Sequence, residues 1–497
     1  MISAKNGNGK MISKRIALIG YSPIYFASFA AALEQAQFVI HWVHATRSAA
    51  VAHVRRGGTA PARILDTTLN FVPDFGDPSD SQQMLSGLEF CDGPRLNDII
   101  LMDRVLKKKP RDFSLKYLAH LQRVLTAFLS EHDIQLVSSG RDTALQLMSM
   151  LVCRQLGIAW VSPARVRIPH NLYMFTSGHD TESIVRIRAG TRADRAWAET
   201  FLEEFRSRAV AGLLKAATTT FVDVIRIMPR HARLFIALVA HSLADLGNDF
   251  SRYTVPRIIA MYLRRRFNML LYKLFPPYST PRDRPYCLYA LHTQPESSID
   301  VTGSFFSDQI ALITFIARSL PVTYDLYVKI HPTDVDGRPI SWFRQIAQIP
   351  SVRLIGHEVG IRGLLDRTSL VFTLTGTVGY EAGLIGKPVV TFAKNFYNGM
   401  PTVHYWDSPP ALPSLIASLL TTPISGDVDG AILSFLAELK THCFEGEVNR
   451  MYQPDAAELS EKDLAGLRQA YESLFDVLAK GGYPQSITPQ SLKNASV

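Results

Sequence analysis

The residues best suited to chemistry lie in three short segments of the second half of the chain. The most informative begins at Thr373 and reads TLTGTVGYEAGLIGKP: an apolar strand ends at Thr375, Gly376 and Thr377, and a helix follows at once. Backbone N–H groups at a helix start are unpaired and the helix dipole favours an anion there, so this turn predicts a phosphate site. Glu381 follows in the first turns of the helix, where a carboxylate can accept hydrogen bonds from ribose hydroxyls. We predict nucleotide binding here; the alternative is a plain turn in which Glu381 only complements the dipole.

The second segment, VKIHP, ends another predicted strand. Lys329 and His331 stand two residues apart and can therefore share one side of the strand end. In open α/β sheets the carboxyl ends of the strands face the ligand crevice, and a histidine held there can donate to a phosphate or stabilise a departing one. Pro332 then turns the chain out of the strand. We predict that Lys329 and His331 bind the phosphate of a ligand and that His331 is also catalytic, with a purely structural histidine as the alternative.

The third segment, HTQPESS, follows the predicted strand Tyr286–Leu291 directly, so it opens onto the same edge of the sheet. We predict that Gln294, Ser297 and Ser298 bind the same phosphate-bearing ligand. Glu296 is predicted to contact the sugar, the base or the acceptor in a catalytic role. The alternative is a polar loop that only caps the next helix.

Acidic residues elsewhere raise two further questions: whether Asp142 is part of a site, and whether two Asp-x-Asp triplets bind a metal. In the first half, SSGRDT over 138–143 follows a predicted strand and opens a helix, so Asp142 and Arg141 are candidates for a catalytic or acceptor-binding role. A helix cap with an Asp that pairs with the dipole is the alternative. Two Asp-x-Asp triplets, at 334–336 and 427–429, look like metal ligands, but each precedes a glycine in a predicted turn, which Asp-Gly favours in any case. We therefore predict no metal.

Sheets must hold these segments in place. Apolar runs in the first half predict strands with helices between them; the strands are Ile16–Ile19, Phe38–Val43 and Ile134–Val137, and the helices cover about 115–130 and 143–156. In the second half a run of strand–helix units extends from Tyr286 to Phe392. Strands that alternate with helices indicate parallel sheets. We predict an α/β fold with two Rossmann-like, doubly wound domains.

Length and composition set the domain plan. A chain of 497 residues that is 47% hydrophobic is long enough for two cores. The predicted plan has a disordered lead over 1–13, an N-terminal domain over 14–277 with a helical insertion at about 194–275, a linker over 278–285, a C-terminal domain over 286–430, and C-terminal helices with a polar tail over 431–497. A signal peptide over Ile16–Leu33 is the alternative to a first strand and helix there.

Charge and cysteine usage narrow the partners and the compartment. The formal net charge of +9 suits phosphate-bearing ligands, anionic membranes or nucleic acid. No zinc finger, recognition helix or basic-aromatic pattern is present, so nucleic acid is not expected. The four cysteines form no Cys-x-x-Cys pair, which favours the reducing cytoplasm. No uncharged apolar run reaches the roughly 18–20 residues of a membrane span.

A basic amphipathic helix is predicted over Pro256–Tyr272. In it the arginines Arg264, Arg265 and Arg266 stand beside the apolar residues Ile258, Ile259, Leu263, Phe267 and Leu270. Such a helix can lie on an anionic membrane, and we predict a peripheral contact through the three arginines. The alternative is a helix packed on its own protein with a solvated arginine face.

The three segments HTQPESS, VKIHP and TGTVGYEAGLIGKPVVTF together resemble the bacterial capsule polysaccharide biosynthesis proteins, a group that includes transferases of the acidic sugar Kdo. The resemblance covers about residues 286–400 and extends more loosely to bacterial sialyltransferases. It implies a GT-B fold with the donor mainly on the C-terminal domain. It also implies that His331, Thr375 and Thr377 hold the donor phosphate and that Glu381 belongs to the nucleotide-binding helix. Phe396–Gly399 fits the aromatic and glycine that family members often carry after the last strand.

The resemblance implies a glycosyltransferase of surface polysaccharide biosynthesis. The expected donor is CMP-Kdo or a related activated acidic sugar, the expected acceptor is a glycan or glycolipid, and no cofactor or metal is expected. The enzyme is expected in the cytoplasm, with contact to the inner face of the membrane. Two alternatives stay open: an enzyme like the UDP-sugar 2-epimerases, which share the fold, and a non-catalytic scaffold of a polysaccharide assembly complex.

Overall fold

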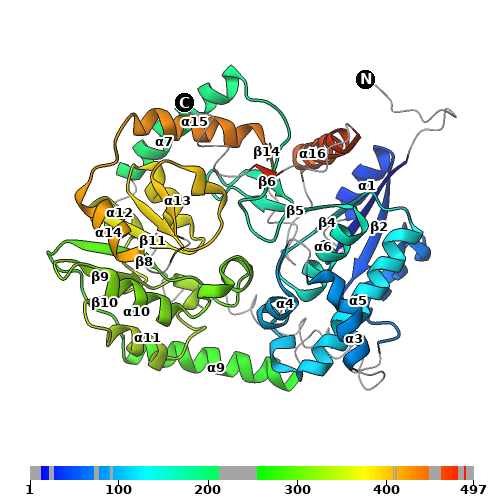
Figure 1. Ribbon diagram of the computed structural model, residues 1–497, viewed down its shortest axis with the longest axis horizontal. Helices are drawn as coiled ribbons and strands as arrows, with labels where there is room; N and C mark the ends of the chain where they lie inside the picture. The colour runs from blue at the N-terminus through cyan, green and yellow to red at the C-terminus, as the bar shows by residue number, and fades with distance from the viewer. Residues whose placement is uncertain are drawn as a thin grey trace. The chain divides into compact units, whose positions relative to one another are not determined.

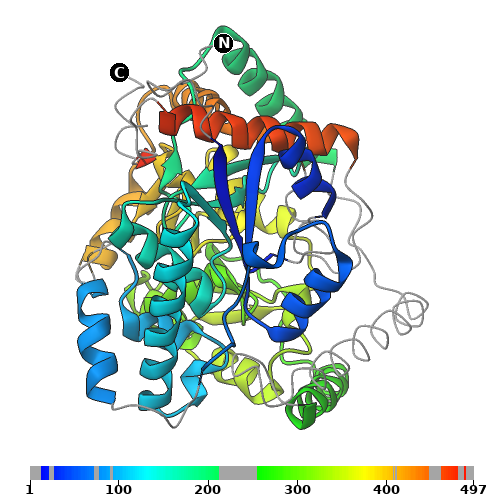
Figure 2. The ribbon, with the colours of Figure 1, turned by 90° about the vertical axis from the view of Figure 1, so that its right-hand side faces the viewer.

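The computed structural model describes residues 13–21, 27–71, 78–89, 93–211, 255–406, 408, 411–446, 460–479 and 486–487. Contacts divide the chain into two compact units, each with its own sheet (Figures 1 and 2). The first unit contains the described residues up to Ala189 and those from Thr441 to Ile487. The second contains the described residues from Gly190 to Lys440.

The first unit is built on a nine-stranded sheet. Its parallel part has the order β3-β2-β1-β4-β5, with β1 (Lys14–Ile19), β2 (Phe38–His44), β3 (Ile64–Asp66), β4 (Leu136–Ser139) and β5 (Ala159–Arg165). An antiparallel extension follows, made of β6 (Leu172–Thr176), β7 (Ile184–Val185), β14 (Cys443–Glu445) and β15 (Ser486–Ile487). Successive residues from Ile16 to Ile19 are all fully buried, so both faces of β1 are covered, as expected for a parallel strand between helices.

Helices and short turns connect these strands. The helices of the first unit are α1 (Ala27–Gln35), α2 (Arg47–Arg56), α3 (Pro78–Leu85), α4 (Leu96–Met102), α5 (Arg111–Glu131), α6 (Ala144–Leu156) and α16 (Glu461–Ala479). Short 3₁₀ turns lie at η1 (Pro61–Arg63), η2 (Ser86–Leu88) and η3 (Leu106–Lys108).

The last helix, α16, completes the core of the first unit. Figure 2 shows it, in red, alongside α1. The ring of Tyr471 packs against Phe29 of α1 and Phe175 of β6, with centroids 5.2 Å apart in both cases. Its hydroxyl lies 2.6 Å from Ser138 Oγ of β4. Because these contacts are buried, α16 is part of this unit's core and not an appended tail.

The second unit contains a six-stranded, wholly parallel sheet of order β10-β9-β8-β11-β12-β13. The strands are β8 (Tyr286–Ala290), β9 (Asp325–Lys329), β10 (Val352–Ile355), β11 (Leu370–Thr373), β12 (Val389–Thr391) and β13 (Val403–Tyr405). In chain order this is 3-2-1-4-5-6, the Rossmann arrangement, whose direction reverses between β8 and β11. The predicted fold class, α/β with two Rossmann-like units, is confirmed.

The helices of the second unit are α7 (Arg192–Ala211), α9 (Val255–Leu274), α10 (Gln309–Ser319), α11 (Ile340–Ala347), α12 (Ile361–Arg367), α13 (Thr377–Leu384), α14 (Leu412–Thr421) and α15 (Val428–Thr441). Shorter turns are η5 (Ser298–Thr302), η6 (Ser304–Phe306), η7 (Pro332–Asp334) and η8 (Phe396–Gly399). No helix in the described parts of the chain is both long and apolar enough to cross a bilayer.

The structure divides the helices differently from the predicted domain plan. Helices α7 and α9, predicted as an insertion in the N-terminal domain, belong to the second unit. Arg206 of α7 donates to the Leu384 carbonyl at 3.0 Å, and Asn268 of α9 donates to the Asp336 carbonyl at 3.2 Å. Helix α16, predicted to follow the C-terminal domain, belongs to the first unit. The sequence predicted that α7, α9 and α16 are helices. A helical pattern does not tell which part of the protein covers the buried face of a helix.

The predicted linker over 278–285 also belongs to the second unit. The Ser279 N–H donates to the Leu354 carbonyl of β10 at 2.8 Å, and the Arg282 N–H donates to the Tyr327 hydroxyl of β9 at 2.6 Å. The segment therefore runs along the sheet. The predicted lead apart from Ser13, the part of the helical insertion over 212–254 and most of the predicted polar tail lie outside the described residues.

Candidate functional site

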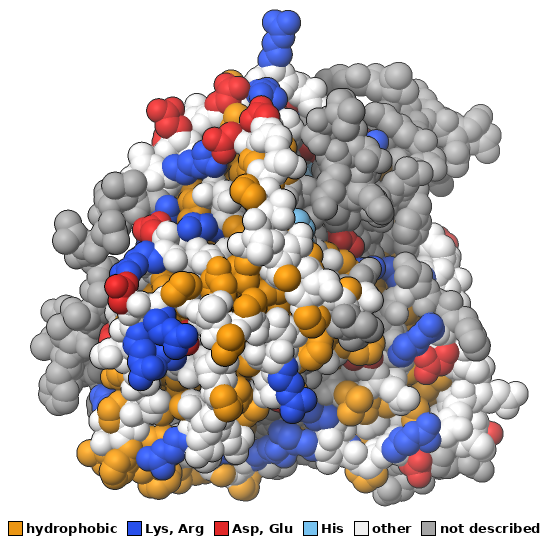
Figure 3. All heavy atoms as spheres, turned by 60° about the vertical axis from the view of Figure 1, so that its left-hand side comes forward, with side chains coloured by type: hydrophobic (Ala, Val, Ile, Leu, Met, Phe, Trp, Pro, Cys, Tyr) orange, Lys and Arg blue, Asp and Glu red, His pale blue; other side chains and the backbone are white. Residues whose placement is uncertain are grey.

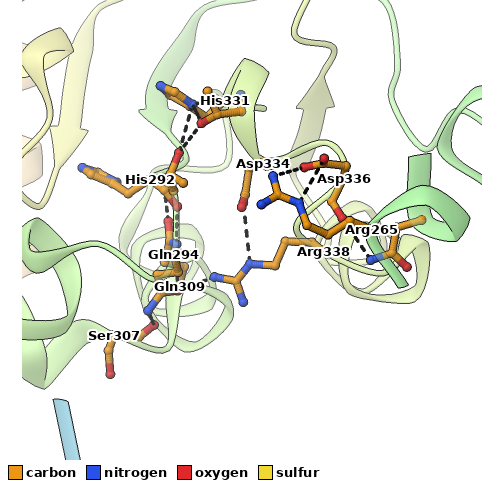
Figure 4. A network of polar contacts seen from close by, with 12 residues as sticks. Arg265, His292, Gln294, Ser307, Gln309, His331, Asp334, Asp336 and Arg338 are labelled. Atoms are coloured by element: carbon orange, nitrogen blue, oxygen red, sulfur yellow. Dashed lines mark hydrogen bonds and ion pairs between the residues drawn. The ribbon is translucent and has the colours of Figure 1, made fainter. Parts of the chain in front are cut away.

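The three polar segments predicted from the sequence meet at the carboxyl ends of β8, β9 and β11. Parallel neighbours end at the same edge of a sheet, and the reversal of strand order between β8 and β11 separates the loops that follow them. The loop after β8 begins at His292, the loop after β9 holds His331, and the turn after β11 leads into α13. Hydrogen bonds connect all three, and Figure 4 shows the network of the first two.

His331 is held by two threonine hydroxyls. Its Nδ1 atom lies 3.0 Å from Thr293 Oγ1 and 2.7 Å from Thr333 Oγ1, and it also accepts the Thr333 backbone N–H at 3.3 Å. Because Nδ1 accepts that N–H, the neutral ring carries its proton on Nε2. Desolvation lowers the pKa of His331 and Lys329 lowers it further, while Glu296 opposes the shift. The outward Nε2–H has no partner among the described residues, so it is available as a donor to a ligand.

His292 anchors the turn after β11. Its Nε2 lies 3.1 Å from Thr373 Oγ1 and accepts the Thr375 backbone N–H at 3.4 Å. Thr373 Oγ1 in turn accepts the Gly376 N–H at 2.9 Å. A Cβ at Gly376 would lie 2.8 Å from Thr373 Oγ1 and 3.1 Å from His292 Nε2, so only glycine fits without a shift. Neither His292 nor Thr373 was predicted to have a role in the site.

Helix α13 begins without a side-chain cap. Its N-cap is Gly376, and the backbone N–H groups of Thr377 and Val378 have no acceptor among the described residues. The Thr377 hydroxyl is likewise unbonded within those residues, whereas the Thr375 hydroxyl donates to the Ser298 carbonyl at 3.3 Å. Uncapped N–H groups at the positive end of a helix dipole form an anion site. Thr377 therefore has the free donors, and Thr375 shapes the turn.

Glu381 lies in the same helix with its carboxylate half-buried. The carboxylate makes no hydrogen bond or ion pair with the described residues. Desolvation raises the pKa of Glu381 to about 7, and the nearby Arg362 guanidinium opposes that shift. A carboxylate that has lost water without gaining a partner is stabilised by ligand hydroxyls that donate to it.

Gln294 lies inside the network that shapes the loop after β8. Its amide nitrogen donates to Asp300 Oδ1 and to the Ser307 carbonyl, each at 3.1 Å, and its oxygen accepts from Gln309 and Arg338 (Figure 4). This amide is fully engaged, so the structure places Gln294 as a support of the loop. The Glu296 carbonyl accepts the N–H groups of Ile299 and Asp300, whereas its carboxylate makes no hydrogen bond or ion pair with the described residues.

The other predicted donor-binding residues have diverse surroundings. The Lys329 ammonium is buried and donates to the carbonyls of His357 at 3.0 Å and Ile330 at 3.3 Å; desolvation lowers its pKa to about 8. Ser297 precedes η5, and its side chain forms no cap hydrogen bond. Ser298 contributes its carbonyl to the Thr375 hydroxyl. Lys329 thus ties β9 to the loop after β10.

Three aspartates of the two Asp-x-Asp triplets lie against arginines of the protein itself. Asp334 is fully buried against Arg338, with 3.6 Å between Oδ2 and Nε, and burial raises the pKa of Asp334 to about 6. Asp336 pairs with Arg265 at 2.6 Å, and Asp429 pairs with Arg206 at 2.7 Å. Within the described residues no group of His, Cys, Asp and Glu is arranged to hold a metal ion.

Asp142 lies in the first unit, at the turn between β4 and α6. Arg104 Nη2 donates to both of its carboxylate oxygens, at 2.8 and 2.9 Å. The cap of α6 is Thr143, whose hydroxyl accepts the Gln146 N–H. Arg141 donates to the Asp180 carbonyl at 2.6 Å. The carboxylate that sequence analysis selected here is therefore held by an arginine.

Comparison with known proteins agrees with the segments that build this site. The sequence model of the family described as "Capsule polysaccharide biosynthesis protein" matches residues 250–402. The capsule polysaccharide modification protein LipA of Neisseria meningitidis serogroup B is 35% identical over 75 residues, which cover 15% of this chain and 11% of LipA. LipA of serogroup A is 31% identical over 99 residues, covering 20% of this chain and 14% of LipA. The matched part is thus a small fraction of those relatives.

Two solved structures are similar at low identity. The Thermosulfurimonas dismutans KpsC β-Kdo 2,7-transferase is 11% identical, with a TM-score of 0.31, over 72% of this chain and 90% of that chain. The UDP-GlcNAc 2-epimerase of Neisseria meningitidis bound to UDP-GlcNAc is 11% identical, with a TM-score of 0.28, over 94% and 99%. At these scores the fold assignment rests on the strand order of the two sheets.

The strand order and the uncapped helix start define the second unit as a Rossmann-like α/β domain with a candidate anion site at its switch point. Residues 250–402 match the sequence model of the capsule polysaccharide biosynthesis family, and the predicted resemblance is confirmed over that segment.

Proposed function

We propose that the protein is a glycosyltransferase of surface polysaccharide biosynthesis that binds a nucleotide-sugar on its second unit. The observation that carries the proposal is the uncapped start of α13 and the unpartnered Nε2–H of His331 at the same carboxyl edge of a Rossmann-like sheet, on either side of β8. These donors suit a phosphate, and the unpaired carboxylate of Glu381 suits ribose hydroxyls. The capsule family match over the same segment supports a sugar-linked nucleotide.

In this proposal the acceptor hydroxyl attacks the anomeric carbon while the bond between that carbon and the phosphate oxygen breaks. The nucleotide leaves with added negative charge, which His331 and the N–H groups of Thr377 and Val378 stabilise. The proton of the acceptor hydroxyl passes to a carboxylate, for which Glu296 and Asp142 are the candidates. Arrangement of donors before the reaction is what lowers the barrier, since no reorganisation is then needed as charge develops.

The finer assignments follow the family resemblance. We propose CMP-Kdo or a related activated acidic sugar as donor, a GT-B pairing of the two Rossmann-like units, and a glycan or glycolipid as acceptor. The reaction is proposed to need neither metal nor cofactor, because the phosphate donors above are dipoles and an imidazole. The proposed place of action is the cytoplasmic face of the membrane.

The first test is a nucleotide panel. CMP, CDP, UMP, UDP and the corresponding sugar nucleotides are added to the purified protein, and the thermal midpoint is measured, since a ligand that binds only the folded state raises stability by mass action. We expect cytidine nucleotides to give the largest increase. Absence of an increase with every nucleotide overturns the proposal.

The second test separates transfer from its two alternatives. Slow hydrolysis of the preferred donor, with release of free sugar and nucleotide, indicates a transferase acting with water as acceptor. Interconversion of UDP-GlcNAc and its 2-epimer indicates an epimerase-like enzyme. Nucleotide binding without turnover of any donor, including in the presence of acceptor glycans, indicates a scaffold.

A further inference from the structure

Helix α9 is attached to the second unit along one face. Arg265 donates to both carboxylate oxygens of Asp336, at 2.6 and 3.1 Å, and Asn268 donates to the Asp336 carbonyl at 3.2 Å. One turn further, the buried Tyr272 packs against Phe343 of α11 with ring centroids 5.8 Å apart. These contacts fix which side of α9 faces the protein. They also show that Arg265, predicted to face a membrane, is used within the protein.

The opposite face of α9 is apolar and exposed. Leu263 is 62% exposed, Phe267 is 59% exposed and Leu270 is 52% exposed. Two further residues, Ile259 and Leu274, continue the same stripe at spacings of three and four residues. We call these five residues the α9 stripe. Ile258, which sequence analysis assigned to the apolar membrane face, is half-buried on the protein side.

Basic residues border the α9 stripe on both sides. At 3.6 residues per turn, Arg266 and Lys273 fall along one border, and Arg257 and Arg264 fall along the other. All four are exposed, and the helix contains no acidic residue. Along the lower edge of Figure 3, the height at which α9 lies in Figure 1, hydrophobic and basic side chains lie side by side.

We propose that the α9 stripe docks on the surface of an anionic lipid bilayer. An apolar stripe between two rows of cations matches a surface that has acyl chains below a layer of negative headgroups. A second protein would need acidic side chains along both borders of the stripe, whereas an anionic bilayer has negative headgroups at every position. Because α9 has five basic residues, it lies on the bilayer and does not cross it. The proposal does not depend on the reaction proposed above.

Docking in this way orients the candidate site. Asp336, which holds Arg265, lies five residues after His331 in the segment that follows β9, and Figure 4 shows both at one network. Asp336 thus links the helix on the bilayer to the segment that also holds His331, within the second unit.

The test is sedimentation of the full chain with vesicles at low salt. Vesicles of phosphatidylcholine alone are compared with vesicles that also contain phosphatidylglycerol. We expect binding only to the anionic vesicles, and release at about 0.5 M salt, where the screening length falls to roughly 4 Å. Phe267→Gln with Leu270→Gln, and separately Arg264→Gln with Arg266→Gln, should each reduce binding about tenfold or more.

The matched controls are Val322→Gln and Arg318→Gln, exposed apolar and basic residues of the same unit that lie away from α9. Both should bind anionic vesicles like the unaltered chain. If the Gln variants of α9 lose their fold by circular dichroism, Phe267→Trp replaces them, and its added emission should shift to the blue with anionic vesicles.

Four results overturn the proposal. The unaltered chain fails to sediment with anionic vesicles at low salt, or the α9 variants sediment as well as the controls, or the Phe267→Trp emission does not move. A dimer that dissociates in the Phe267→Gln, Leu270→Gln variant also overturns it, since the α9 stripe is then covered by a second copy.

Discussion

The fourth strand of each Rossmann-like sheet leads through a short turn into a helix, and the two helices differ in whether their first N–H groups are capped. In the first unit, Thr143 caps α6, and Asp103 Oδ2 accepts the Ala144 N–H at 3.0 Å. The Gln146 amide fills the space beside the turn: a Cβ at Gly140 would lie 2.6 Å from its nitrogen. In the second unit, α13 has no side-chain cap and its first N–H groups stay open within the described residues.

The presence of a cap on α6 and its absence on α13 indicate which of the two similar sheets can bind a ligand at this turn. Both turns have glycine, hydroxyls and a helix dipole, so the sequence pattern alone makes both candidates. In the first unit the protein supplies its own acceptors, and an anion would have to displace them. In the second unit the acceptors are left for a ligand. We therefore place the phosphate at α13.

The largest expected effect is on His331. His331→Ala should lower donor turnover by roughly 10²-fold, because the departing phosphate loses an oriented donor. The measurement is nucleotide release from the preferred donor, with His170→Ala, an exposed histidine of the first unit, as the control. Near-normal turnover in a folded His331→Ala protein contradicts the assignment. Asp142→Asn tests which unit supplies the proton acceptor. Lost turnover with unchanged nucleotide affinity in this variant would assign the proton acceptor to the first unit.

The next effect concerns Glu381. Glu381→Ala should weaken nucleotide binding by about 1.5–3 kcal/mol, since ribose hydroxyls lose a charged acceptor. Calorimetric titration with CMP and UDP measures it, and Glu472→Ala on α16 of the first unit serves as the control. Unchanged affinity for both nucleotides means that Glu381 is only a partner of the helix dipole.

The pH dependence of binding tests the same carboxylate in the unaltered chain. Burial raises the pKa of Glu381 from 4.5 to about 7, and only the ionised form accepts two ribose hydrogen bonds. Affinity should therefore rise about tenfold between pH 6 and pH 8. Glu381→Gln should remove this part of the rise, while the titration of the nucleotide phosphate stays. Equal pH profiles for both proteins would contradict this role.

The stability of the empty protein should change with pH in the opposite sense. The folded chain holds the Glu381 proton more tightly than the unfolded chain does. The contribution of this group to the free energy of unfolding therefore falls as pH rises from 4.5 through 7. Urea titrations at pH 5 and pH 7.5, compared between the unaltered chain and Glu381→Gln, measure that difference; a larger stability gain with pH in the unaltered chain contradicts it.

The smallest effect compares the two turns directly. Gly376→Ala places a methyl group 2.8 Å from Thr373 Oγ1, so the turn must shift, and nucleotide affinity should fall by roughly fivefold. Gly140→Ala meets the end of the Gln146 side chain and should change stability only. Calorimetry gives the nucleotide affinity of each variant, and thermal unfolding gives its stability. If Gly140→Ala weakens nucleotide binding more than Gly376→Ala does, the ligand belongs to the first unit.

The sequence predicted the strands and the site loops because both depend on local pattern. Apolar runs bounded by turn residues located β8, β9 and β11 within one or two residues, and polar residues at their ends marked the site edge. The role of His292 was missed, since it depends on a hydrogen bond to Thr373, 81 residues away. The pairing of Asp142 with Arg104 was missed for the same reason, at a separation of 38 residues. Contacts of that range depend on the fold, which local pattern does not specify.

The return of α16 to the first unit sets an order of events during synthesis. The strands of this unit's parallel sheet leave the ribosome before the second unit, but the core that Tyr471 and its neighbours complete waits until α16 has been made. At roughly 5–20 residues per second, that delay lasts some tens of seconds. The described part of the second unit, between Gly190 and Lys440, emerges whole within this interval. The first unit is thus begun before the second and completed after it.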